Sequence, residues 1–114
     1  MAECVFCKII VGEIAAPKIY ENDEVIAIND INPVANVHVL IISKRHYGSI
    51  LSEGIEGSGL LDGVLRAARE IAKIKGISES GFRLVSNCGE DGGQSVPHLH
   101  FHIIGGQRLG ARVI

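Results

Sequence analysis

Three histidines alternate with apolar residues near the end of the chain. The segment QSVPHLHFHIIGG, residues 94–106, places His98, His100 and His102 two positions apart, and the chain has only five histidines. Side chains on a β-strand alternate between its two faces, so a strand here would put all three imidazoles on one face and the apolar residues on the other. Because every buried ring needs a hydrogen-bond partner, such a row is a poor core filler. The pattern therefore indicates a functional site.

Two kinds of chemistry fit this row of histidines. A His-x-His pair can hold zinc from one face of a strand. The outer two histidines of an extended strand lie roughly 13 Å apart, however, whereas a ring nitrogen lies about 2.1 Å from bound zinc, so one ion does not easily take all three. Nucleophilic catalysis can use all three, because one neutral imidazole attacks while flanking rings donate hydrogen bonds to an anion. A metal held by two of them and a distant ligand stays an alternative.

A glycine-rich loop, GEDGGQSVP at residues 89–97, leads directly into the histidines. Its glycines allow backbone N–H groups to approach a ligand closely. Gln94 and Ser95 add neutral donors just before the first histidine. The combination predicts a phosphate bound at the edge of the histidine row. The sequence contains neither a P-loop nor a dinucleotide-binding fingerprint.

A second candidate site is the Cys4-x-x-Cys7 motif. Zinc usually needs two further ligands, so one such pair is weak evidence for a metal. The alternative is a pair of buried cysteines on one face of a helix, which their spacing allows. Cys88 is expected to be an ordinary core or loop residue.

The elements that must position these residues follow from the apolar patterns and the turn residues. Together they predict an α+β domain built on an antiparallel sheet. In chain order we expect a short helix at 4–12, a hairpin at 18–30 with its turn at Asn22–Asp23, a loop at 31–37, a central strand at 38–44, a long helix at 58–76 and two strands at 81–87 and 98–105.

The long helix is predicted to cover the apolar face of the last strand. Ser58 can cap its start, and Gly76 can take the left-handed conformation after its end. Its apolar stripe comprises Leu60, Leu61, Val64, Leu65, Ala68, Ile71 and Ala72, which recur at helical spacing.

Composition limits the function classes. A chain of 114 residues is the size of one domain, here residues 1–114. The net charge of −2 and the absence of a basic stripe argue against polymeric nucleic acid as a partner. The sequence has no run of about 18 apolar residues, the length that would predict a membrane span. The first ten residues do not look like a signal peptide. With an odd number of cysteines, three, the sequence favours a reducing, cytoplasmic setting.

The segment HLHFHII matches the signature of the histidine triad (HIT) family. The N-terminal part, CVFCKIIVGEIAAPKIYENDEVIAINDINPVANVHVLIISKRH, also resembles that family, so the resemblance covers most of the chain. It implies a HIT-like fold, a five-stranded antiparallel sheet with one long helix and a short N-terminal helix. The short length resembles the nucleotide-binding branch often called Hint. Its members are homodimeric purine nucleoside phosphoramidases, which split a nucleoside 5′-phosphoramidate into a nucleoside monophosphate and an amine.

The resemblance implies a role for each matching residue. His100 would attack the α-phosphorus and form a nucleotidyl-histidine, which water hydrolyses. His98 would orient it through its backbone carbonyl, His102 would contact the phosphate, and His38 would support the nucleophile. These groups demand no cofactor for catalysis. The remaining nucleotide contacts would be Asn87, Gly93, Gln94 and Ser95 at the phosphate or leaving group, and Asp30 with Ile31 at the ribose. Without the resemblance, Asp30 would be read as a turn residue and His38 as structural.

The resemblance also bears on the cysteines and on the C-terminal tail. Some microbial members have the same cysteine pair, completed by two histidines to a structural zinc site. Here the ligands would be Cys4, Cys7, His46 and His98. Better-known Hint members carry a Trp and a Pro-Pro-Gly ending, whereas this chain ends GGQRLGARVI with Ala111 near the Trp position. That departure leaves the amine leaving group open.

Two rival functions remain at this point. The first is hydrolysis of dinucleoside polyphosphates, as in the fragile histidine triad branch. The second is a nucleotide-binding or scaffold module with incidental activity. The intact triad favours an enzyme, because a pure binding module could lose its nucleophile.

Overall fold

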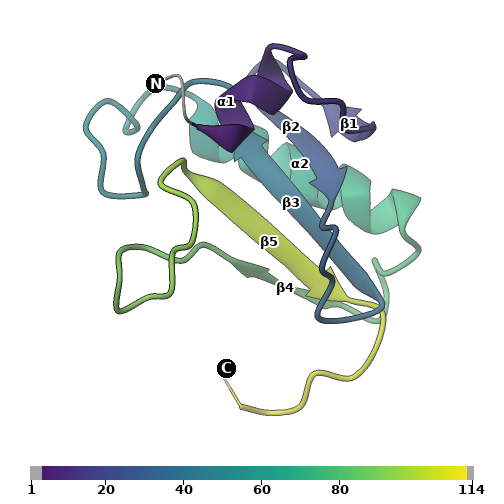
Figure 1. Ribbon diagram of the computed structural model, residues 1–114. Coiled ribbons are helices and arrows are strands. Elements are labelled where there is room, and N and C mark those ends of the chain that lie inside the picture. The colour runs from purple at the N-terminus through teal and green to yellow at the C-terminus, as the bar shows by residue number, and fades with distance from the viewer. Residues whose placement is uncertain (1–3, 113–114) are drawn as a thin grey trace.

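The computed structural model describes residues 4–112. Figure 1 shows a sheet with one helix on each side. Among the described residues, no helix has the length and apolar character needed to cross a membrane. The elements in chain order are α1 (Val5–Ile10), β1 (Lys18–Glu21), β2 (Val25–Asn29), β3 (Val37–Ser43), α2 (Leu60–Ile74), β4 (Phe82–Val85) and β5 (His100–Gly105).

The five strands form one antiparallel sheet in the order β1-β2-β3-β5-β4. β3 is the middle strand, as its β-branched apolar sequence predicts. It pairs with β5 so that Leu40 lies opposite His102 and Ile42 lies opposite His100. The predicted α+β fold, with five antiparallel strands, one long helix and a short N-terminal helix, is confirmed.

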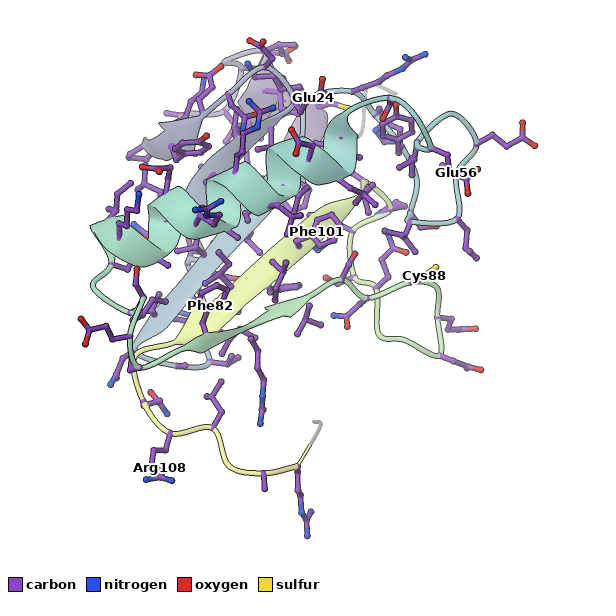
Figure 2. The ribbon with its side chains drawn as sticks, turned by 180° about the vertical axis from the view of Figure 1, so that it is seen from behind. Glu24, Glu56, Phe82, Cys88, Phe101 and Arg108 are labelled. Carbon is purple, nitrogen blue, oxygen red and sulfur yellow. The ribbon has the colours of Figure 1, made fainter. Side chains whose placement is uncertain are left out.

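The two faces of the sheet carry alternate residues of each strand, as the pleat requires. α2 covers one face, and Figure 2 shows it lying across the sheet with Phe101 of β5 on the same side. α1 covers part of the other face, and the histidines lie on this side with it. The α2 face includes Val25, Ala27, Val39, Ile41, Phe101 and Ile103, and the α1 face includes Ile26, Ile28, Leu40 and Ile42.

Helix α2 differs from its prediction at its start and on its stripe. It begins at Leu60 after Gly59, so Ser58 is not its N-cap residue, although the Ser58 hydroxyl accepts the Leu60 N–H at 3.1 Å. Gly76 has φ of 71° after the helix end, as predicted. Leu61 and Leu65 are 49% and 57% exposed, because the helix buries a narrower stripe than its apolar residues suggested.

The predicted start of the last strand is wrong by two residues, since β5 begins at His100 rather than His98. The N–H of His98 donates to the Val96 carbonyl at 2.8 Å, a three-residue turn that removes it from the sheet ladder. Pro97, between them, has no N–H to offer. His98 nevertheless lies on the histidine face, because its ring and that of His100 both pack against Phe6 of α1.

Candidate active site

His100 is the buried middle ring of the row and is only 5% exposed. Its Nδ1 lies 2.6 Å from the backbone carbonyl oxygen of His98. A carbonyl oxygen only accepts, so Nδ1 carries the proton of the neutral ring and Nε2 keeps a free lone pair. The structure thus contains the contact between the His98 carbonyl and His100 that the resemblance implied. It leaves Nε2 as the nitrogen able to attack.

The ring of His98 belongs to a different cluster from that of His100. Its Nε2 lies 2.7 Å from the carbonyl oxygen of Ser43 and therefore donates to it. Its Nδ1 lies 3.3 Å from Cys4 Sγ and 3.5 Å from Cys7 Sγ. Cys7 Sγ in turn lies 3.2 Å from His46 Nδ1. The lone pair of His98 thus faces two thiols and a second imidazole.

This cluster of Cys4, Cys7, His46 and His98 fits a tetrahedral metal site. Its four ligand atoms all lie within 4.8 Å of one another. Ligands bound to zinc at 2.0–2.3 Å are about 3.4–3.8 Å apart in a tetrahedron, close to the sulfur–nitrogen distances found here. The donation from His98 to Ser43 also fixes the tautomer that a metal-binding histidine needs. Burial raises the pKa of the Cys7 thiol and lowers that of His98, so it favours the neutral form of both groups.

His102 lies at the opposite end of the row, in a cluster without sulfur. Its Nδ1 is 2.9 Å from Nε2 of His38, the residue that opposes Ile104 at the start of β3. The His38 Nε2 is also 3.4 Å from Asp30 Oδ2. The other nitrogen of His38 accepts the Val34 N–H at 3.1 Å. His38, which the resemblance expects to support the nucleophile, thus contacts the triad through His102.

These contacts fix the protons of the second cluster. Because His38 Nδ1 accepts a backbone N–H, neutral His38 carries its proton on Nε2 and donates it to His102 Nδ1. Neutral His102 then carries its own proton on Nε2. Burial lowers the pKa of His102, and the nearby His100 and His38 act in the same direction, so the ring is neutral at pH 7. Adjacent rings therefore offer a free lone pair on His100 and an N–H donor on His102.

Phe6 of α1 is a site residue that the sequence reasoning missed. Its ring meets His100 edge-on, with centroids 5.0 Å apart at 79°, and meets His98 in the same manner at 5.8 Å. This packing restricts the orientation of both imidazole rings. In the sequence, only its position between the two cysteines indicated a role for Phe6. Helix spacing alone does not predict which strand a residue of the helix will contact.

The glycine-rich loop uses much of its hydrogen-bonding capacity on itself. The N–H groups of Gly93 and Gln94 donate to the carbonyls of Glu90 and Gly89, both at 3.0 Å. Gly92 is needed because a Cβ there would lie 2.5 Å from the Cys88 carbonyl oxygen. The glycines therefore allow the loop to fold compactly on itself. Only those backbone N–H groups that are not used within the loop can bind a ligand.

Gln94 braces this loop. Its Oε1 accepts the Gly89 N–H at 3.0 Å, and its Nε2 donates to the carbonyls of Gly48 and Val96 at 2.7 and 3.0 Å. Both hydrogens of the amide are thus in use, so a contact to phosphate requires Gln94 to exchange a partner. Ser95 is exposed and Asn87 is half-buried, at the two ends of the loop.

Asp30 combines the two interpretations that the sequence left open. Its Oδ1 accepts the Asn32 N–H at 2.8 Å, as a turn residue would, while its Oδ2 faces His38. Ile31 beside it is 91% exposed, so its side chain is available to a ligand.

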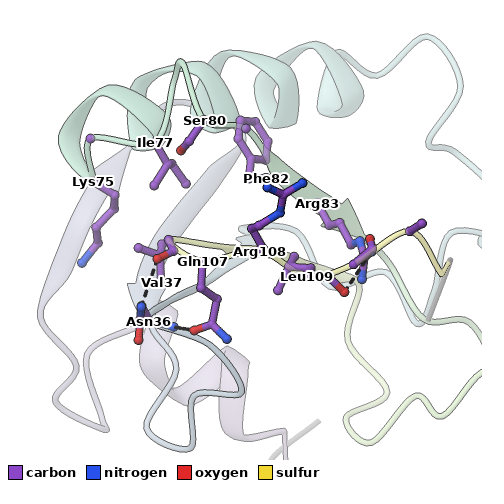
Figure 3. A pocket seen from close by; sticks show the side chains of 15 residues that line it. Asn36, Val37, Lys75, Ile77, Ser80, Phe82, Arg83, Gln107, Arg108 and Leu109 are labelled. Atoms are coloured by element: carbon purple, nitrogen blue, oxygen red, sulfur yellow. Dashed lines mark hydrogen bonds between the residues drawn. The ribbon is translucent and has the colours of Figure 1, made fainter.

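A cavity of about 870 Å³ lies away from the histidines, at the far end of β5 (Figure 3). The tail lines one side of it, held by Arg83, whose guanidinium donates to the carbonyls of Gly110 and Arg112 at 2.7 Å. Ala111, in the part of the tail that departs from the family pattern, lines this cavity.

Known proteins share both the sequence and this architecture. Residues 11–109 match the model of the HIT domain. The chain is 39% identical over 108 residues to the purine nucleoside phosphoramidase of Escherichia coli K12, covering 95% of this chain and 91% of that protein. A HIT family hydrolase from Clostridium thermocellum superposes with a TM-score of 0.94 at 44% identity, over 100% of this chain and 99% of that one. A histidine triad protein from Clostridium difficile gives 0.91 at 44% identity, over 98% and 97%.

The family match spans the triad, the strand that carries His38 and the loop between them, and the sheet superposes over its whole length. The chain therefore belongs to the HIT family, and it is a hydrolase of that family.

Proposed function

We propose that this protein hydrolyses purine nucleoside 5′-phosphoramidates to a nucleoside monophosphate and an amine, with His100 as the nucleophile. The observation that carries the proposal is the 2.6 Å bond from His100 Nδ1 to the His98 carbonyl, which leaves Nε2 unprotonated. A neutral imidazole with a free ring nitrogen is a competent nucleophile. The substrate class is supported by the similarity to the Escherichia coli phosphoramidase.

The proposed reaction has two steps, transfer of the nucleotidyl group to His100 and its hydrolysis. His100 Nε2 forms a bond to the α-phosphorus while the P–N bond breaks, and the leaving amine takes up a proton from a neighbouring ring or hydroxyl. Water then attacks the nucleotidyl-histidine, its oxygen binds phosphorus, and the His100–phosphorus bond breaks. The nucleoside monophosphate leaves and a proton is released. Holding the reacting groups in place and stabilising phosphoryl charge supply most of the acceleration.

The remaining predicted residues are assigned to the nucleotide. His102 donates its Nε2–H to a phosphate oxygen, which agrees with the tautomer set by His38. Asp30 accepts from the ribose hydroxyls, and Ile31 lies beside the sugar. The phosphate and leaving group meet Ser95, Asn87, Gly93 and Gln94, of which Gln94 acts mainly by bracing the loop.

We also propose that Cys4, Cys7, His46 and His98 hold a structural zinc ion. The fit rests on their mutual distances and on the donor set of two thiols and two imidazoles, which zinc prefers. The ion would link α1 to the segment before β5 and would take no part in the chemical steps. The three cysteines are free thiols, which agrees with a reducing, cytoplasmic location.

The protein is further proposed to act as a homodimer paired through β4. β4 is an edge strand, and it leaves Phe82 and Leu84 each 37% exposed. An unpaired edge with apolar side chains is a template for strand addition, and pairing two copies of β4 would close it symmetrically. Leu84→Lys should convert a dimer to a monomer in sedimentation, whereas an unchanged mass would refute pairing through this strand.

Comparing substrates tests the proposed activity. Purified protein is given adenosine 5′-phosphoramidate or diadenosine polyphosphate, and adenosine monophosphate is measured over time. We expect the phosphoramidate to be turned over faster. Preference for the polyphosphate would favour the rival hydrolase, and nucleotide binding without turnover of either would favour a binding module.

A further inference from the structure

The two residues after β5 accept two hydrogen bonds from Asn36, the last residue of the loop that precedes β3. Gln107 Oε1 accepts the backbone N–H of Asn36 at 2.8 Å, and Asn36 Nδ2 donates to the Gly106 carbonyl at 3.0 Å. Figure 3 shows both bonds at the edge of the tail cavity. We call this pair of residues, Asn36 and Gln107, the loop clamp. It joins positions 71 apart in the chain.

The chain approaches itself unusually closely at the loop clamp. Gly106 has φ of 80°, and a Cβ there would lie 2.9 Å from Val37 Cγ2 and 3.1 Å from Asn36 Cβ. Only glycine fits such a position without displacing the neighbouring chain. The contact is therefore built into the backbone as well as into the two side chains.

The loop held by the clamp, residues 30–36, contacts His38 through Val34 and through Asp30, and only the Val34 N–H bonds to Nδ1 of its ring. Val34, two residues before Asn36, donates its N–H to His38 Nδ1, and His38 donates from Nε2 to His102. If the Val34 bond is lost, only His102 and Asp30 hold the proton of neutral His38 on Nε2, so the population of the Nδ1–H form should rise. In that form His38 Nε2 no longer donates to His102, and its lone pair faces the Asp30 carboxylate.

We infer that Asn36 and Gln107 are positioning residues, which hold loop 30–36 so that the Val34 N–H keeps His38 and His102 in their working tautomers. The effect on turnover rests on the proposed function, whereas the effect on the tautomers does not. Both residues are exposed, so their substitution removes hydrogen bonds without opening the core.

The tautomers can be measured directly by nitrogen NMR of the imidazole rings in the full chain labelled at histidine. Wild-type His38 should show the Nε2–H form at neutral pH. Asn36→Ala and Gln107→Ala should each convert part of this signal to the other form. Gln107→Glu keeps the acceptor oxygen and should restore the wild-type spectrum, and Arg108→Gln, in the adjacent residue, should not change it. An unchanged His38 signal in both alanine variants would overturn the inference.

Turnover of adenosine phosphoramidate by the same variants separates the two proposals. The alanine variants should lose about threefold to tenfold in kcat, the range expected for one neutral hydrogen bond, with recovery in Gln107→Glu. Shifted tautomers with undiminished kcat would overturn the catalytic part of the inference. A wild-type protein that lacks phosphoramidase activity yet shows the tautomer shift in the variants would refute the proposed function and leave the clamp in place.

Discussion

The two ends of the histidine row differ in everything except residue type. At one end His98 faces two thiols and the imidazole of His46, and its Nδ1 lone pair is directed at sulfur. At the other end His102 accepts a hydrogen bond from His38, which lies beside the Asp30 carboxylate. His100 stands between them with one nitrogen fixed and one free.

The residues that other elements place beside each histidine therefore decide what that histidine does. α1 supplies soft sulfur ligands to one end, whereas the start of β3 and the loop before it supply hydrogen-bonding groups to the other. Each group of ligand atoms among the described residues includes only one triad histidine. The first end is suited to stability and the second to proton placement, and the following substitutions test that division.

Replacing the middle ring should have the largest effect. His100→Ala removes the triad ring whose Nδ1 is held by a carbonyl and whose Nε2 lone pair is free, and we expect kcat to fall about 10⁴-fold or more. Nucleotide affinity, measured by calorimetry with adenosine monophosphate, should stay within a few-fold of wild type. Mass analysis of a quenched wild-type reaction should find the nucleotidyl adduct on His100. Surviving turnover would remove this residue as the nucleophile.

Removing metal should act mainly on stability, through the sulfur end. Protein purified without chelator should hold about one zinc per chain, and stripping it should lower the free energy of unfolding by about 4 kcal/mol if free metal had stood 1,000-fold above Kd. Cys4→Ala should lower stability similarly, whereas Cys88→Ala, outside the cluster, should change it little. Metal analysis and urea denaturation measure both quantities. A zinc content near zero with unchanged stability would contradict the assignment.

The two histidines outside the triad, His38 at one end and His46 at the other, provide a matched pair of substitutions. His38→Ala leaves His102 Nδ1 without its donor, and we expect kcat to fall about 100-fold, or about 2.7 kcal/mol in the barrier. His46→Ala should instead lower zinc affinity and stability with a small change in kcat at saturating zinc. Steady-state kinetics and thermal melts on both variants check this. The division between the ends fails if the two substitutions have the same profile.

The pH dependence of stability should give the smallest effect. Burial lowers the folded-state pKa of His102 below its ordinary 6.5, with His100 from β5 and His38 from β3 adding to it and Asp30 opposing it. As pH falls below about 6.5 the unfolded chain takes up a proton that the folded ring resists, so the free energy of unfolding decreases until the folded pKa is passed. Urea denaturation between about pH 5 and 8 measures this. His102→Gln should reduce the slope, and an equal slope would refute the assignment.

Much of the fold and part of the site could be predicted from the sequence. Strand alternation placed the three histidines on one face and the apolar residues under α2, because the period of two is a property of the backbone. It could not show that His98 leaves the strand, since the turn around Pro97 depends on which carbonyl accepts the His98 N–H. Nor could it show that Gln94 is occupied by Gly48, a partner distant in sequence, or that Phe6 packs against His100. These contacts depend on the tertiary arrangement.

His98 joins the sulfur end to the middle of the row. Its ring lies among the thiols, while its carbonyl oxygen holds His100, the proposed nucleophile. Any change that shifts this residue within the sulfur cluster therefore also moves the anchor of His100, so substitutions at Cys4 and at His100 should be non-additive in double-mutant cycles. His98 thus contributes both to the stability of the sulfur cluster and to the placement of His100. A substitution that changes one of these should also change the other.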